Sequence, residues 1–398
     1  MMPRSETRTS KRALAAVCAA ALVVALAVPA LAPRGRAAEP AAAFNPMAGD
    51  GMWIWYVSRA GGSAARIAQK ARRNGIEVVF IKSADAHNSW SQFSPQLVRD
   101  LQARGLKVCA WQFVYGRGAK AEADAAIRSV RRGADCFVID AEGHYEGRYA
   151  QASTYTRRLR SAVGSEYPLA LASFPYVDYH PAFPFSVFLG PGGAQYNLPQ
   201  LYWKTIGARV DAAFIHTWVF NRPYDRAIMP LGQVYLNPKP KQIRRFRRLV
   251  LAHDMEGVSW WSWQHAGRQQ WKAVRAPVAE PSGYEPYDSY PTLRLGSQGD
   301  LVAWAQQLLR GGGYSTPVSG YFEASTRSAL LAMQNDAGLE ETGEADPATW
   351  ERLLEFEPLP VRWTKNGAVP ASGAGVVLPE PRSADLPAQG YEIPPGRR

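Results

Sequence analysis

Between Gly51 and Val274, short apolar runs alternate with longer segments in which apolar residues recur every three or four positions. The short runs predict β-strands, and the periodic segments predict amphipathic helices. The expected strands are residues 52–57, 77–83, 107–114, 136–141, 169–174, 197–203, 228–235 and 257–263. The expected helices between them are residues 63–73, 95–104, 119–132, 147–163, 210–220 and 240–253.

About eight β/α units in a segment of this length are typical of an α/β fold of the (β/α)8 TIM-like barrel type, which we expect over residues 48–276. An open doubly wound sheet is the alternative, but it predicts a glycine-rich phosphate loop after the first strand. Residues 58–62 are a poor version of such a loop. Residues 175–193 of the fifth unit are rich in Pro, Phe and Gly and show no clear long helix. This irregular insert follows a strand at the end where barrel enzymes bind ligands.

A Pro- and Tyr-rich linker is expected over residues 277–291, followed by a small all-α bundle over residues 292–354. Asp300 and Ser325 stand where helix N-caps are expected. The motifs of this segment are the run 293–302, Gly-Tyr-Phe at 320–322, Thr326, Met333-Gln334, Gly338-Leu339, Thr342-Gly343 and Thr349-Trp350. In these motifs the bundle resembles the three-helix peptidoglycan-binding domain of secreted wall enzymes, although Ser319 stands where that family usually has Asp. Residues 355–398 lack periodicity and are expected to be largely disordered.

Residues 1–38 are expected to form a signal peptide, because four basic residues precede an Ala-rich apolar run from Ala13 to Ala32. A retained membrane anchor is the alternative, since the run approaches a spanning length. With the peptidoglycan-binding resemblance, these residues predict a secreted protein associated with the cell wall. No stable membrane association is expected after cleavage of the signal.

The net charge of +12 suits contact with anionic wall polymers. Nucleic acid is the usual alternative partner of a basic chain, but we find no nucleic-acid motif and expect no such partner. The strongest basic run, residues 243–250, interleaves its arginines with apolar residues at helical spacing. Its arginines are therefore expected to form the solvent-exposed face of an amphipathic helix. Peptidoglycan and other wall glycans remain the expected partners.

Cys109 and Cys136 each fall near the start of a predicted strand. A secreted protein can oxidise such a pair if the geometry allows, but two free buried thiols are favoured. No cysteine–histidine cluster suggests a structural zinc site. Neither a metal nor a cofactor is required by the pattern.

The predicted strand at 136–141 ends in two carboxylates, Asp140 and Glu142, separated by one residue. Because strand side chains alternate, both point to the same side, and burial around Val138 places that side toward the barrel axis and its mouth. Two nearby carboxylates repel, which raises one pKa and keeps one group protonated beside a charged neighbour. Glycosidic bond cleavage needs such an arrangement. Two solvated acids at a strand end are the alternative.

Other strand ends carry aromatic and polar side chains that are able to stack on sugar rings or bond their hydroxyls. Any single tryptophan is more often a core residue, but the density of aromatic residues at strand ends favours a carbohydrate site. The substrate-binding candidates are Lys82, Asp85, Trp111, Gln112, Asp178, Gln200, Tyr202, Tyr235, Trp261 and Trp263.

The Asp-x-Glu motif after an apolar fourth strand resembles glycoside hydrolase barrels, especially the family-25 muramidase type. That resemblance implies that Glu142 is the general acid and Asp140 its electrostatic partner. The family usually has an acid on the first strand, and residues 51–58 contain none. A distant relative with another substrate, or an inactive barrel, therefore stays open.

Chitinase-like barrels use the same motif in a second mechanism, in which the 2-acetamido oxygen of the substrate attacks the sugar carbon. The resemblance then implies that Asp140 orients the acetamido group while Glu142 protonates the leaving oxygen. Peptidoglycan sugars carry that group. An inverting route stays open until the carboxyl separation is known. The favoured function is glycoside hydrolysis of peptidoglycan or a related N-acetylated polysaccharide, and the alternative is a non-catalytic wall-binding protein.

Overall fold

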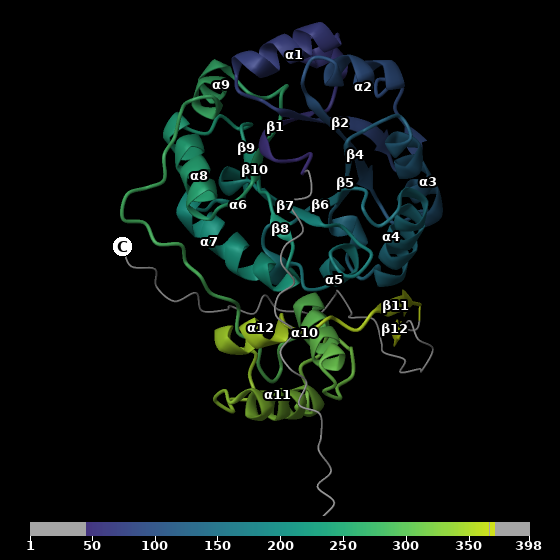
Figure 1. The fold of residues 1–398 in the computed structure, drawn as a ribbon, viewed down its shortest axis with the longest axis vertical. Helices are drawn as coiled ribbons and strands as arrows, with labels where there is room; N and C mark the ends of the chain where they lie inside the picture. The colour runs from purple at the N-terminus through teal and green to yellow at the C-terminus, as the bar shows by residue number, and fades with distance from the viewer. Residues whose placement is uncertain (1–44, 366, 371–398) are drawn as a thin grey trace, which may run out of the picture. The chain divides into compact units, whose positions relative to one another are not determined.

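The computed structural model describes residues 45–365 and 367–370, and the expected signal peptide lies outside them. In this part of the chain, eight parallel strands close into a barrel, because β1 pairs with β10 on one side and with β2 on the other (Figure 1). The predicted TIM-like barrel is confirmed. Its strands are β1 (Gly49–Ile54), β2 (Val78–Asp85), β4 (Lys107–Val114), β5 (Cys136–Ala141), β6 (Leu169–Ser173), β7 (Tyr196–Leu201), β9 (Leu231–Gln233) and β10 (Gly257–Trp261).

The interior of the barrel is filled by every second side chain of its strands. On β5, Cys136 and Val138 point inward, so Asp140 belongs to the same row and lies at the carboxyl end of the strand. Two short strands extend the sheet: β3 (Asn88–Ser89) is antiparallel to β2, and β8 (Ala227–Ile228) is parallel to β7.

Helices surround the barrel as an outer ring (Figure 1). Helix α8 shows why these segments are helical, because Ile243, Phe246, Leu249 and Val250 form its buried face, as the pattern predicts. The helices outside the barrel are α1 (Ala64–Arg73), α2 (Pro95–Gln102), α3 (Ala119–Val130), α4 (Tyr149–Val163), α5 (Phe185–Phe188), α6 (Trp203–Ile206), α7 (Val210–Asn221), α8 (Pro240–Ala252) and α9 (Arg268–Val274). The 3-10 turns are η1 (Val57–Ala60), η2 (Gly143–Tyr145), η3 (Val177–Tyr179) and η4 (Arg222–Tyr224).

The fifth unit of the barrel is irregular, as its composition predicts. Between β6 and β7 the chain forms only η3 and the four-residue helix α5. We call residues 174–193 the insert.

The bundle consists of α10 (Asp300–Gly311), α11 (Ala324–Ala337) and α12 (Pro347–Leu353). Two buried glutamines hold its loops: Gln306 accepts hydrogen bonds from the backbone of Ser319 and Gly320, and Gln334 accepts one from Gly343. The predicted N-caps are wrong, because Gly299 precedes α10 and Glu323 precedes α11. The side chain of Asp300 is directed instead toward the insert.

Residues within the tail that the sequence predicts to be disordered form a β-hairpin. Strand β11 (Val361–Thr364) pairs with β12 (Gly367–Pro370) in antiparallel register. The indole of Trp363 is buried and packs on the ring of Tyr149 in α4, with ring centroids 4.4 Å apart. This aromatic contact stabilises a segment whose Pro-, Gly- and Ala-rich composition gives no periodic signal.

The linker at residues 277–291 contains no helix or strand within the described chain, yet it is held on the barrel. Arg222 of η4 forms an ion pair with Asp288 and lies 4.1 Å from the centroid of the Tyr290 ring. The indole of Trp350 in α12 donates a hydrogen bond to the carbonyl of Pro291. The end of the linker therefore contacts both the barrel and the bundle.

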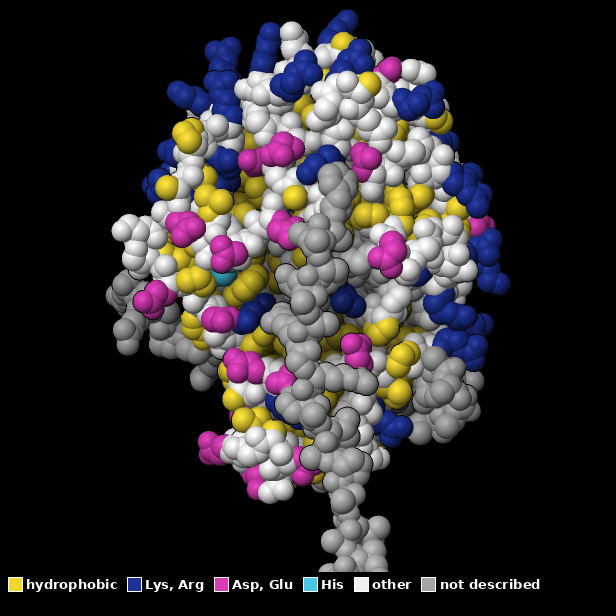
Figure 2. Space-filling view, in the orientation of Figure 1, with side chains coloured by type: hydrophobic (Ala, Val, Ile, Leu, Met, Phe, Trp, Pro, Cys, Tyr) yellow, Lys and Arg dark blue, Asp and Glu magenta, His cyan; other side chains and the backbone are white. Residues whose placement is uncertain are grey.

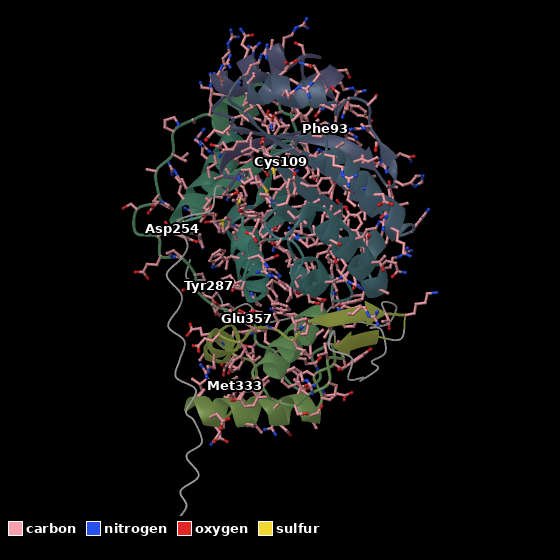
Figure 3. All side chains as sticks on the ribbon, turned by 45° about the vertical axis from the view of Figure 1, so that its right-hand side comes forward. Phe93, Cys109, Asp254, Tyr287, Met333 and Glu357 are labelled. Carbon is pink, nitrogen blue, oxygen red and sulfur yellow. A yellow bond between two sulfur atoms is a disulfide. The ribbon has the colours of Figure 1, made fainter. Side chains whose placement is uncertain are left out.

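Cys109 and Cys136 form a disulfide inside the barrel (Figure 3). The expectation of two free thiols is wrong, and the sheet register gives the reason. The two residues are direct partners in the pairing of β4 with β5, both point inward, and their Cα atoms lie 4.6 Å apart. This separation is within the range of disulfides.

Lys and Arg side chains gather over α1 and α2 and along α3 and α4 (Figure 2). The last turn of α1 alone carries Lys70, Arg72 and Arg73. Basic residues on the outer helices attract polyanions without contributing to the barrel interior. Among the described residues, no helix combines the length and apolar character needed to cross a membrane.

Candidate active site

A cavity of about 550 Å³ opens at the carboxyl ends of the barrel strands. Its two carboxyls and its amide, from Asp140, Glu142 and Gln200, lie at the carboxyl ends of β5 and β7, and one wall comes from the first half of the insert. It is lined by Trp53, Asp140, Glu142, Phe174, Pro175, Tyr176, Tyr179, His180, Gln200, Tyr202, Thr205, Ile206, Leu231 and Trp261.

Asp140 and Glu142 line the same cavity, as the alternation of strand side chains predicts. The side-chain amide of Gln200 joins them: its nitrogen Nε2 donates to Asp140 Oδ1 at 3.0 Å and to Glu142 Oε1 at 2.9 Å. Gln200 lies on β7, two strands from β5 around the barrel. Asp140 is buried, while Glu142 is partly exposed to the cavity.

Burial raises the pKa of Asp140 well above its usual value, and the neighbouring Glu142 carboxylate raises it further. The Lys82 ammonium and the hydrogen bond from Gln200 oppose this rise without cancelling it. The carboxylate pair therefore keeps a proton at a pH where isolated carboxyls have lost theirs. Burial and the same two carboxylates also raise the pKa of Tyr202 well above its usual value, so its hydroxyl stays protonated.

Two indoles line the floor of the cavity, and a third packs behind them. The ring of Trp53 lies 5.4 Å from that of Trp111 and 5.8 Å from that of Trp261, and Trp111 lies 5.5 Å from Trp261. Trp53 and Trp261 line the cavity, whereas Trp111 is buried behind them. Such a floor presents an apolar, polarisable surface of the kind that packs against the C–H face of a sugar ring.

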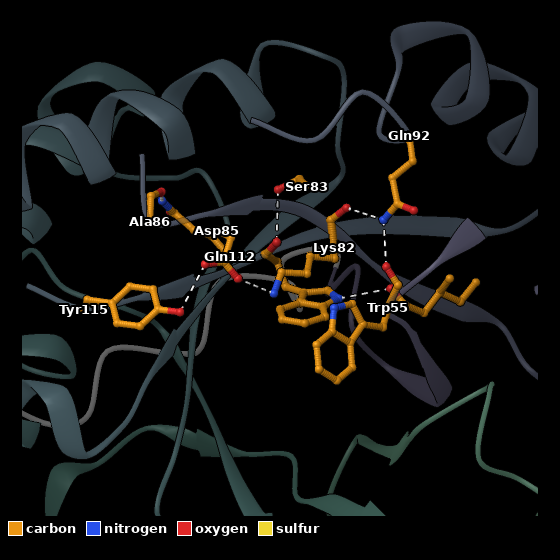
Figure 4. A network of polar contacts seen from close by, with 10 residues as sticks. Trp55, Lys82, Ser83, Asp85, Ala86, Gln92, Gln112 and Tyr115 are labelled. Atoms are coloured by element: carbon orange, nitrogen blue, oxygen red, sulfur yellow. Dashed lines mark hydrogen bonds and ion pairs between the residues drawn. The ribbon is translucent and has the colours of Figure 1, made fainter. Parts of the chain in front are cut away.

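Lys82 lies beneath the aromatic groups of the barrel mouth (Figure 4). Its ammonium is 4.8 Å from the ring centroids of Trp90 and Trp111, and it forms an ion pair with Asp85 at 2.6 Å. Because Lys82 is only 3% exposed, it has little surface to offer a substrate. Its charge acts instead on the buried Asp140 carboxyl.

Gln112 and Trp263 lie outside the cavity. Trp111 points inward, so alternation turns Gln112 outward, where its amide bonds to the carbonyl of Glu122 and to the hydroxyl of Tyr155. Strand β10 ends at Trp261, so alternation no longer governs Trp263. Trp263 packs against Trp271 of α9 instead.

Asp178 and Tyr235 support the cavity walls without lining them. Asp178 pairs with His216 of α7 at 2.7 Å, and His216 stacks on Tyr176, which does line the cavity. The hydroxyl of Tyr235 lies 2.6 Å from that of Thr205. The first contact positions Tyr176 from α7, and the second positions Thr205 of α6 from the loop after β9.

The insert contributes wall residues that are not among the predicted substrate-binding residues. Phe174, Tyr176, Tyr179 and His180 line the cavity, whereas Asp178, the substrate-binding residue predicted from this segment, does not. Trp53, which is not among the predicted site residues, also lines the cavity. Its signal in the sequence is that it shares one side of the chain with Trp55, which directly follows β1. Within the described residues, no group of three or more His, Cys, Asp or Glu side chains is arranged to hold a metal ion.

Residues 298–353 match the family model described as "Putative peptidoglycan binding domain". No curated protein matches the chain. Similar solved structures include a chitinase from Chromobacterium violaceum, with 10% identity and a TM-score of 0.43 over 57% of this chain and 98% of that one. The spore cortex-lytic enzyme SleL from Bacillus cereus has 9% identity and a TM-score of 0.42 over 57% and 73% of the two chains. The family-25 resemblance stays a prediction.

Proposed function

We propose that the barrel is a glycoside hydrolase that acts on peptidoglycan or a related N-acetylated polysaccharide. The observation that carries this proposal is the pair of Asp140 and Glu142, joined by Gln200 at the bottom of an aromatic cavity. Burial and the Glu142 carboxylate raise the pKa of Asp140, so the pair holds a proton, and we assign its delivery to Glu142 because that side chain is the one partly exposed to the cavity.

The carboxyl spacing disfavours an inverting route. The two facing oxygens lie 3.0 and 2.9 Å from one nitrogen, so they are closer than the roughly 6.5 Å at which inverting pairs begin. An inverting enzyme needs room for a water molecule between its carboxyls. Here the Gln200 amide lies between them.

In the proposed reaction, Glu142 donates its proton to the glycosidic oxygen as the bond from that oxygen to C1 breaks. The acetamido oxygen of the same sugar bonds to C1, and Asp140 accepts a hydrogen bond from the acetamido N–H. Water then attacks C1 as the bond from C1 to the acetamido oxygen breaks, and it gives a proton to Glu142, which restores the acid. No cofactor takes part in these steps.

The bundle is proposed to bind peptidoglycan, and the matching family model supports this assignment. A secreted location at the cell wall follows from it and from the expected signal peptide. A non-catalytic wall-binding protein remains the second candidate. It is favoured by the absence of an acid at the carboxyl end of β1, whose one acid, Asp50, lies near its amino end.

Gln200→Ala is expected to lower hydrolysis of cell-wall glycan by about tenfold, because it releases both carboxyls from their common donor. The pKa of Asp140 should also rise further, since the bond from Gln200 lowers it. Reducing ends released from purified peptidoglycan measure the effect. Gln195→Ala is the matched control, because Gln195 precedes the amino end of the same strand and bonds to Leu169 and Ser165. Equal loss in both variants would contradict the role of Gln200.

Anchoring is tested by pull-down of the full chain with insoluble peptidoglycan stripped of anionic polymers. If the bundle recognises the glycan or its peptide, binding should persist between about 0.1 M and about 1 M salt, where the Debye length falls from about 10 to about 3 Å. Binding that requires the anionic polymers and disappears at high salt would assign the anchor to the basic helices of the barrel instead.

A further inference from the structure

The insert has two halves with different partners. Its first half lines the cavity through Phe174, Tyr176, Tyr179 and His180. Its second half, which includes α5, contacts α10 of the bundle (Figure 1). One short segment therefore connects the wall of the candidate active site with the bundle.

Asp300, the first residue of α10, forms the centre of this connection. Its backbone N–H donates to the carbonyl of Pro181 at 2.8 Å. Its carboxyl accepts bonds from the backbone and hydroxyl of Ser186, both at 2.7 Å, and from the hydroxyl of Tyr224 at 2.9 Å. Asp300 is completely buried. The side chain of Tyr149 in α4 also forms a hydrogen bond with it. A buried carboxyl that takes all these bonds from the barrel domain specifies one arrangement of the two surfaces.

The backbone at this junction approaches too closely for a larger residue. Gly299 has φ +119°, and a Cβ placed on it would lie 2.6 Å from the Cβ of Pro181. The indole of Trp304, one helical turn along α10, donates to the carbonyl of Pro223 in η4. The first turn of the bundle therefore fits the insert and the end of α7 through specific contacts.

On its other side, the insert is bonded to the loop that follows Glu142. The ring of His180 bonds to Glu146 at 2.7 Å and stacks on Phe174 with centroids 3.4 Å apart. The backbone N–H of Gly147 donates to the carbonyl of Ala182 at 2.8 Å. The insert therefore lies between the bundle and the segment that carries the proposed acid.

We propose that the bundle is part of the active site as well as an anchor, because Asp300 positions the insert that forms one wall of the cavity. Asp300 is a positioning residue here, since it acts through the insert and contacts no substrate. This inference rests on the proposed function. It implies that the bundle affects hydrolysis even of short, soluble substrates, for which anchoring to an insoluble wall gives no advantage.

The test uses the full chain and a soluble oligosaccharide of N-acetylglucosamine. Asp300→Ala should lower kcat/KM on this substrate by about tenfold, because small displacements of a site wall are costly to turnover. Hydrogen exchange should increase at residues 174–188 and remain unchanged in β1 and β2. Asp300→Asn should retain most activity, since an amide oxygen replaces the acceptor for Ser186 N–H and Tyr224, and an amide N–H donates to the Ser186 hydroxyl.

Gln334→Ala is the matched control, because Gln334 is equally buried and bonds only to bundle residues such as Thr342 and Thr349. It should leave kcat/KM and the exchange of residues 174–188 unchanged. If Asp300→Ala does not fold, Tyr224→Phe removes a single donor to Asp300 and should change both readouts in the same direction by a smaller factor.

A folded Asp300→Ala variant with wild-type kcat/KM and wild-type exchange would overturn the inference. If the wild type cleaves no glycan, the proposed function fails instead, and the exchange measurement still decides whether Asp300 orders the insert. Equal effects of Gln334→Ala and Asp300→Ala would also overturn it, because loss of bundle stability alone would then explain the change.

Discussion

Glu142→Gln should reduce hydrolysis of purified cell walls by about a hundredfold to ten-thousandfold, the range that general acid catalysis contributes. The substitution keeps the shape of the side chain and its contact with Gln200 but removes the proton donor. Fold and glycan binding should be retained. Asp140→Asn should also impair turnover, because it removes the carboxylate charge that orients the acetamido group, without affecting the proton donor. Initial rates of reducing-end release, with binding measured separately, check both variants.

Glu77→Gln provides the control for this experiment. Glu77 is exposed and precedes β2 at the amino end of the barrel, opposite the cavity. It should have wild-type activity. Wild-type activity in Glu142→Gln would show that another group is the acid.

Asp300 should make the stability of the protein depend on pH in the mildly acidic range. Burial raises its pKa from 3.8 to about 6, and the bonds from Ser186 and Tyr224 only partly offset this. The native state therefore keeps the proton while the unfolded state loses it. The free energy of unfolding should fall as pH rises from about 4 to about 6, by about 3 kcal/mol for a shift of about two units, and then stay level.

Asp300→Asn isolates this contribution because it cannot ionise. Urea unfolding of wild type and variant at pH 4, 5, 6 and 7 gives their difference, from which the titration of all other groups cancels. The free energy of unfolding of the variant, relative to that of the wild type, should increase as pH rises from about 4 to about 6. A difference that is constant with pH would show that folding leaves the pKa of Asp300 unchanged. A difference that changes in the opposite direction would show that folding lowers it.

Much of the barrel follows from local pattern. The strands at Lys107–Val114 and Cys136–Ala141 have the predicted bounds, and the second is flanked by the polar residues Asp135 and Glu142. Alternation along β5 also places Asp140 and Glu142 on one side, and both line the cavity. These features depend on residues close in sequence, which is why they are predictable.

One further local signal concerns Trp111 and Gln112. Because they are adjacent on a strand, at most one of them faces the barrel interior.

Features that depend on strand partners or distant contacts are not predictable in the same way. The bridge from Gln200 to both carboxyls depends on the packing of β7 against β6 and the curvature of the barrel. The pairing of Cys109 with Cys136 depends on register.

Contacts between the insert and the bundle are likewise not predictable from local sequence. Asp300 has the sequence context of a helix N-cap, yet its carboxyl bonds to Ser186, 114 positions away. Residues 361–370 lack periodicity, and the burial of Trp363 on Tyr149 accounts for their order. In both cases a tertiary contact outweighs the local preference.

The most direct test of the central claim is mass spectrometry of the fragments released from purified peptidoglycan by the wild-type chain in water enriched in oxygen-18. Hydrolysis at C1 places one water oxygen on each new reducing end. We predict soluble fragments that carry one such label on the reducing sugar, and their absence with Glu142→Gln. Binding to peptidoglycan without any labelled product would contradict glycoside hydrolysis and favour the non-catalytic wall-binding protein.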